Sequence, residues 1–133
     1  MKKYFLLLTL LLALMCPAFA SAAETSSDKM ILDWQTSKVW MNGENLCVAG
    51  TFVNKRGDLT VTKLNDFLIK ITFTRDDGSE YQYVGKPVKL PMCKVLPNGT
   101  KKLTLNFGKF TDTWKNWVTS QTYTFTYING ARW

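Results

Sequence analysis

The sequence contains no histidine and only three cysteines among its 133 residues. Without histidine, the chain can build neither a Ser-His-Asp triad nor a Cys-His pair, and it has no imidazole to bind a metal ion. It also lacks a glycine-rich phosphate-binding loop. These absences argue against hydrolases, zinc enzymes and nucleotide-binding enzymes. We expect a protein that is not an enzyme and that uses neither a metal nor a cofactor.

Paired carboxylates are the remaining route to acid–base chemistry. The candidates are Asp58, Asp66, Asp76, Asp77, Glu80 and Asp112. The run Asp76-Asp77-Gly78-Ser79 is typical of a hairpin turn, because aspartate side chains bond to nearby backbone amides. A calcium loop needs more oxygen ligands at alternate positions than this turn offers. We therefore assign no catalytic residue and no metal ligand.

The start of the chain has the three parts of a secretory signal. Two lysines precede an apolar stretch, residues 5–15, which is too short for a permanent membrane anchor. Small residues then follow at cleavage spacing. The sequence predicts a signal peptide over residues 1–23, with cleavage after Ala20 or Ala23. Lipidation at Cys16 fits less well, because a methionine stands where a small residue is expected.

Cleavage would leave one domain, residues 24–133, that is exported and either periplasmic or secreted, with no transmembrane segment. Loss of two lysines lowers the net charge from +7 to +5, from 15 basic and 10 acidic residues. The lysines are scattered along the sequence rather than clustered. They form either a solvated surface or one attracted to anionic envelope polymers or lipids. Nucleic acid is not an expected partner outside the cell.

Two cysteines, Cys47 and Cys93, remain in the predicted domain. In an oxidising compartment, such a pair in a small domain forms a disulfide. Closing a loop of roughly 47 residues stabilises a fold by about 4 kcal/mol on the chain-entropy estimate. A metal site with only two cysteines is the alternative, but no histidine is present to complete it.

The domain has the two-residue period of β-strands and no convincing helical period. In the clearest strand, Asp66 to Arg75, four apolar residues (Phe67, Ile69, Ile71 and Phe73) alternate with Lys70, Thr72 and Thr74. Turn sequences recur at intervals of about ten residues, which is typical of antiparallel sandwiches. We predict an all-β fold, a single immunoglobulin-like β-sandwich, with a small β-barrel as the alternative. Residues 24–29 are interpreted as a flexible leader.

Four features form a recognisable series: Val48 to Asn54, the alternating run Phe67 to Phe73, Asp77-Gly78, and the turn Leu96 to Gly99. Together they resemble small bacterial immunoglobulin-like extracellular domains of the FxLYD type and related sandwiches. The resemblance covers Cys47 to Phe107. It departs at Asn98, which separates the proline and glycine of the turn, and it does not include the tryptophan-rich tail. It implies a sandwich fold and an adhesive or accessory role without a shared catalytic site.

Five tryptophans are many for a domain of this size: Trp34, Trp40, Trp114, Trp117 and Trp133. Exposed tryptophans stack on sugar rings or anchor protein partners, whereas buried ones fill the core. Residues 110–118 are the least regular part of the domain, and loops carry recognition more often than strands do. The candidate binding residues are therefore Trp114, Lys115, Asn116 and Trp117; the alternative is that the two rings plug one end of the sandwich.

These observations favour an exported, non-catalytic binding or accessory module of the bacterial envelope. Its expected partner is a protein or a glycan of that envelope. The alternative is a small secreted or periplasmic protein of the inhibitor or immunity type that blocks an enzyme, for which a basic, disulfide-closed scaffold is suitable.

Overall fold

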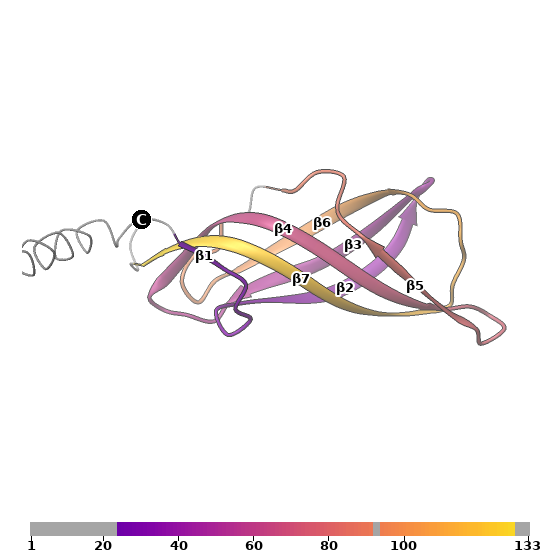
Figure 1. Cartoon of the computed structure of the whole chain (residues 1–133), viewed down its shortest axis with the longest axis horizontal. Coiled ribbons are helices and arrows are strands. Elements are labelled where there is room, and N and C mark those ends of the chain that lie inside the picture. Colours follow the sequence, from indigo (N-terminus) through magenta and orange to yellow (C-terminus); the bar gives the residue numbers. More distant parts are fainter. Residues whose placement is uncertain (1–23, 92–93, 130–133) are drawn as a thin grey trace, which may run out of the picture.

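The computed structural model describes residues 24–91 and 94–129, which form two antiparallel sheets and contain no helix (Figure 1). One sheet has the strand order β1-β7-β4-β5 and the other β2-β3-β6. The strands are β1 Glu24–Ser26, β2 Leu32–Asn42, β3 Asn45–Asn54, β4 Leu59–Thr74, β5 Glu80–Gly85, β6 Thr100–Lys109 and β7 Asn116–Asn129. The predicted all-β sandwich is confirmed.

The core lies between the sheets and follows the alternation of the sequence. In β4, Phe67, Ile69, Ile71 and Phe73 are fully buried, whereas Lys70 is exposed. Fully buried Phe52 from β3 lies in the opposite sheet and contacts the Phe67 ring edge-on. Burying one large apolar side chain from either sheet contributes about 1.5–3 kcal/mol to the free energy of folding. The apolar residues at alternate positions therefore supply the main driving force for this fold.

On one side, side chains of β7 connect the two sheets through hydrogen bonds to β2. The Tyr123 hydroxyl on β7 donates to the Leu32 carbonyl on β2 at 2.6 Å, and the Thr119 and Thr36 hydroxyls are 3.0 Å apart. Gln121 Nε2 donates to a third β2 group, the carbonyl of Trp34. Burial raises the pKa of Tyr123 to about 12, because an ionised phenolate would be poorly solvated there.

The other side is covered by the described parts of the β5–β6 connection, residues 86–91 and 94–99. Its first part lies against the edge strand β6, where the Val88 amide donates to the Asn106 carbonyl at 2.8 Å. Its later part lies against β4, where Val95 forms an antiparallel bridge with Val61. Prolines prevent a continuous ladder, and the described part of this connection contains no strand.

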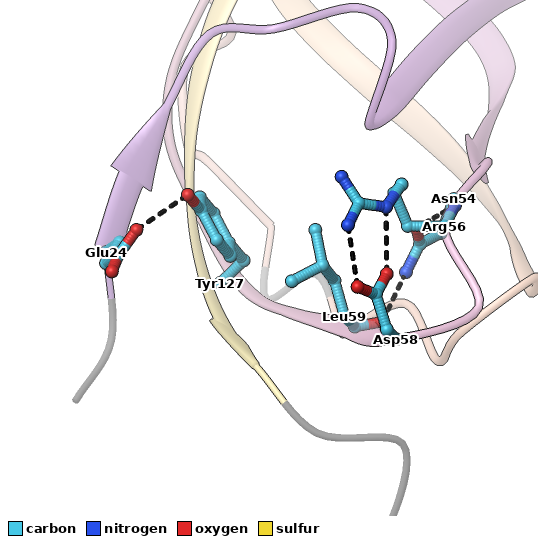
Figure 2. Close-up of polar contacts among 6 residues, drawn as sticks. All are labelled: Glu24, Asn54, Arg56, Asp58, Leu59 and Tyr127. Atoms are coloured by element: carbon cyan, nitrogen blue, oxygen red, sulfur yellow. Dashed lines mark hydrogen bonds and ion pairs between the residues drawn. The ribbon is translucent and has the colours of Figure 1, made fainter. Parts of the chain in front are cut away.

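The interpretation of residues 24–29 as a flexible leader is wrong. Residues 24–26 form β1, which adds to the sheet beside β7. The Tyr127 hydroxyl donates to the Glu24 carboxylate at 2.7 Å and fastens this strand to its neighbour (Figure 2). These residues show no alternation, because a strand of three residues is too short to have a recognisable period.

Near β1, a buried asparagine holds two loops together. Asn54, at the end of β3, is 1% exposed and donates through Nδ2 to the carbonyls of Leu59, Leu96 and Val95 at 2.9, 3.1 and 3.3 Å. Its Oδ1 accepts from the Arg56 amide, and the Arg56 guanidinium bonds Asp58 through two nitrogens (Figure 2). One side chain therefore ties the start of β4, the β5–β6 connection and the β3–β4 turn together through their backbone groups.

Cys47 is buried, 4% exposed, although it points away from the core face of β3. Its cross-strand neighbours are Trp40 on β2 and Asn106 on β6. The structure shows no disulfide for Cys47. Its predicted partner, Cys93, lies outside the described residues, so the pairing stays a prediction.

Candidate functional site at the aromatic end

Aromatic rings from β4, β5, β6 and the β6–β7 connection gather at one end of the sandwich. Phe73 lies at the centre, with ring centroids 4.5 Å from Trp114, 5.2 Å from Phe110 and 5.3 Å from Tyr81. Phe110 also meets Tyr83 edge-on at 5.3 Å. These separations are those of rings in contact. We call this group, with Phe107 beside Tyr83, the aromatic end.

A salt bridge fixes the β6–β7 connection over these rings. Arg75, which follows β4, donates to Asp112 through Nη2 at 2.6 Å and through Nε at 3.3 Å. The same guanidinium lies over the Tyr81 ring, 4.2 Å from its centroid. The two-point contact with Arg75 lowers the pKa of Asp112. Both charged side chains are more than a third exposed, so the bridge positions the loop at the surface.

The Tyr81 hydroxyl is buried behind this bridge. Within the described part of the chain it has no hydrogen-bond partner. Burial raises the Tyr81 pKa, and the negative charge of Asp112 adds to the rise. The group therefore stays protonated at neutral pH.

A surface hollow of about 210 Å³ opens beside Trp114, and its lining includes Met41, Asp112 and Thr113. It combines an indole face, a thioether, a carboxylate and a hydroxyl. Lys115 is exposed next to it, and its amide donates to the Thr74 carbonyl, which ties the connection to β4. Such a mixture of one aromatic face with polar groups suits recognition of a polar ligand or a protein loop.

The four candidate binding residues divide between a loop and a strand. Trp114 and Lys115 belong to the β6–β7 connection, whereas β7 begins at Asn116 and Trp117 is the cross-strand neighbour of Phe73. The prediction that all of residues 110–118 are irregular is wrong for its last part, because β7 pairs with β4 to the end of that strand. Both indoles pack against the core while remaining partly exposed.

The other tryptophans have different environments. Trp34 is buried at 3% exposure and its ring contacts Phe52 and Phe67, so it is a core residue. Trp40 is half-buried on the outward face of β2, with the Lys38 ammonium 4.8 Å from its ring centroid. Trp133 lies outside the described residues.

Two further hollows lie on the outer faces of the sheets. One, of about 350 Å³, lies over β3 and β6 and is lined by residues that include Ser37, Thr51, Lys102 and Thr104. The other, of about 380 Å³, lies over β4 and β7 near Lys70 and Thr122. Each has a floor of strand residues and lacks the gathered rings of the aromatic end.

Within residues 24–91 and 94–129, no three acidic or cysteine side chains lie close enough together to hold a metal ion. Over the same residues, no helix has the length and apolar character needed to cross a bilayer.

Among the residues at this end, the sequence pattern indicates Trp114 as a candidate binding residue but gives no role to Arg75 or Phe110. The sequence presents Asp112 only as a candidate catalytic carboxylate, because its partner Arg75 lies 37 residues earlier in the chain. No local pattern links the two residues. Phe110 is the one sequence signal for this cluster, because an aromatic residue directly after a strand with apolar inward positions indicates that the core continues beyond the strand.

Comparison with known proteins assigns no family to this chain. No family model and no curated protein matches this chain. Among solved structures, the chain is similar to the X-ray structure of Northeast Structural Genomics Consortium target SoR45, with 9% identity and a TM-score of 0.29. That likeness covers 84% of this chain and 76% of the other. It carries no argument about function.

Proposed function

We propose that this protein is an exported, non-catalytic binding module of the bacterial envelope, and that it recognises a protein or glycan through the aromatic end. The proposal includes export through the predicted signal peptide and a periplasmic or secreted location. It agrees with the adhesive or accessory role that the resemblance to small immunoglobulin-like domains implies.

The observation that carries the proposal is the position of Trp114. Its indole packs against Phe73, yet part of it faces the hollow that Asp112 and Thr113 also line. A ring held by the core loses little conformational entropy when it binds a ligand, and this favours affinity. The Arg75–Asp112 bridge holds the connection in place before the partner arrives.

Capture of envelope components by the immobilised protein tests this proposal. Removing the Trp114 ring would also remove core packing, so the informative change is Thr113→Arg, which fills the hollow from an exposed position. We expect this variant to keep its melting temperature and to lose capture of the protein or glycan.

The matched control is Thr122→Arg. Thr122 is also an exposed threonine that lines a hollow, but it lies on the outer face of the four-stranded sheet. This control should capture its partner as the unmodified protein does. Equal capture by both variants, or loss from Thr122→Arg alone, would place binding elsewhere.

A further inference from the structure

The longest stretch of the chain without an acidic residue lies between Glu80 and Asp112. Residues 81–111 contain six lysines and no aspartate or glutamate. They include the β5–β6 connection and β6, an edge strand of the three-stranded sheet. In Figure 1 the ribbon that directly follows β5 runs along the upper side of the molecule as drawn, and β6 rises obliquely towards the same side. Val88 of the connection bonds to the edge strand β6 and Val95 bridges to β4, so lysines that appear scattered in the sequence lie on segments that run along the same side of the sandwich.

Acidic partners from elsewhere neutralise only the first and the last lysine of this stretch. The Lys86 Nζ lies 3.4 Å from Asp66 Oδ1, and the Lys109 Nζ lies 3.7 Å from Glu44 Oε2. Among the described residues, no ion pair reaches the four lysines between them: Lys89, Lys94, Lys101 and Lys102. All four are exposed. We call these four residues the basic edge.

Exposed aliphatic side chains accompany these lysines. Val88 is 72% exposed and Leu96 is 53% exposed, and both lie in the same connection as Lys89 and Lys94. The Val88 amide contacts β6 near its end, and Leu96 accepts from Asn54 near its beginning. A strand of this length spans about 30 Å, so the edge is long enough to meet several lipid headgroups.

We infer that the basic edge binds the surface of an anionic phospholipid bilayer. Lysines that approach such a surface gain about 1 kcal/mol each, which is about five-fold in partitioning. Val88 and Leu96 then enter the headgroup region, where apolar side chains leave water. Charge alone would also attract a soluble polyanion, but the two aliphatic residues favour the bilayer. This surface is distinct from the hollow at Trp114.

Flotation with lipid vesicles tests the inference, using the protein purified after export with its N-terminus determined by mass. We expect binding to phosphatidylglycerol vesicles that weakens steeply with salt, and no binding to phosphatidylcholine vesicles. Lys101→Gln/Lys102→Gln should bind about thirty-fold more weakly, since two lysines are lost. Val88→Ser should weaken binding several-fold.

The matched control is Lys29→Gln/Lys70→Gln, which removes the same charge from exposed lysines at the hollow of the other sheet. It should retain most of the binding. Equal losses in the two double variants would show an effect of net charge and would overturn the inference. Binding to inorganic polyphosphate as tight as to vesicles, with no effect of Val88→Ser, would equally overturn it in favour of a soluble polyanion.

Discussion

Arg75 and Asp112 join the end of β4 to the β6–β7 connection through two hydrogen bonds, of 2.6 and 3.3 Å. This contact decides where Trp114 lies, because Asp112 and Trp114 belong to the same short connection. The recognition surface that we propose therefore depends on an ion pair between segments far apart in the sequence.

Because of the Arg75–Asp112 bridge, the free energy of unfolding should fall as the pH becomes acidic. The pKa of Asp112 is lower in the folded protein than its ordinary value of 3.8. Such a carboxylate contributes stability above its unfolded pKa, and that stability is lost as the pH falls through the folded pKa. Urea midpoints of the native protein and Asp112→Asn should differ at pH 7 and converge as the pH falls below 3.8 through the lowered pKa of Asp112. A difference that is unchanged at low pH would contradict this account.

Core and surface positions of β4 should respond very differently to truncation. Ile71→Ala removes fully buried methyl groups and should lower the free energy of unfolding by about 2–5 kcal/mol. Lys70→Ala, one residue away but exposed, should change it by less than about 0.5 kcal/mol. Chemical denaturation measures both. Similar losses would mean that the faces of β4 are wrongly assigned.

Asn54→Ala should destabilise the protein although it leaves the apolar core intact. The change leaves the Leu59 and Leu96 carbonyls and the Arg56 amide without their side-chain partner. We expect a loss of about 1–3 kcal/mol, the usual penalty for unsatisfied buried groups. Asn106→Ala is the control, since exposed Asn106 bonds only the nearby Gly108 amide through its side chain. A smaller loss for Asn54→Ala than for the control would refute the role given to Asn54.

Tyr123 should titrate later than an ordinary tyrosine. Its pKa is raised from 10.0 to about 12, so the stability that comes from keeping it protonated is complete below pH 10 and is lost as the pH rises towards 12. Ultraviolet absorbance of phenolate should therefore show a late step that is absent from Tyr123→Phe. The loss of one hydrogen bond should also cost that variant about 1 kcal/mol. A titration curve identical in both proteins would contradict the buried position.

The predicted disulfide between Cys47 and Cys93 is tested by mass. Protein isolated from the envelope without reductant should be two protons lighter than the same protein after reduction, and it should resist alkylation. The Val88 amide donates to the carbonyl of Asn106, the cross-strand neighbour of Cys47, whereas Val95 bridges to Val61. Two alkylated thiols after unfolding without reductant would exclude the disulfide.

Much of the fold was predictable because buried strands have a period that the sequence displays directly. Phe67 to Phe73 alternate strictly, and the structure buries their large side chains as expected. The burial of Asn54 could also be predicted from the sequence, because Asn54 follows Phe52 by two residues and so lies on the inward face of β3. A polar residue at such a position indicates a hydrogen-bonding role.

The rest depended on contacts between distant segments. β1 forms only because β7 offers it an edge, and three residues have no period of their own. β7 begins at Asn116 because β4 extends to Thr74 and offers a pairing partner that far. The irregular sequence around Trp114 does not indicate this start. The absence of acidic residues between Glu80 and Asp112 was visible in the sequence, but only the structure brings β6 and its preceding connection to one edge.

The most direct test of the central claim is the response of the individual indole N–H groups to the captured partner. In a ¹⁵N–¹H spectrum, each indole signal is assigned by replacing one tryptophan with phenylalanine. Adding the partner should shift the signal of Trp114 most, while that of buried Trp34 stays unchanged. Shifts confined to Trp40, or a Trp114 signal that does not move at saturation, would contradict binding at the aromatic end.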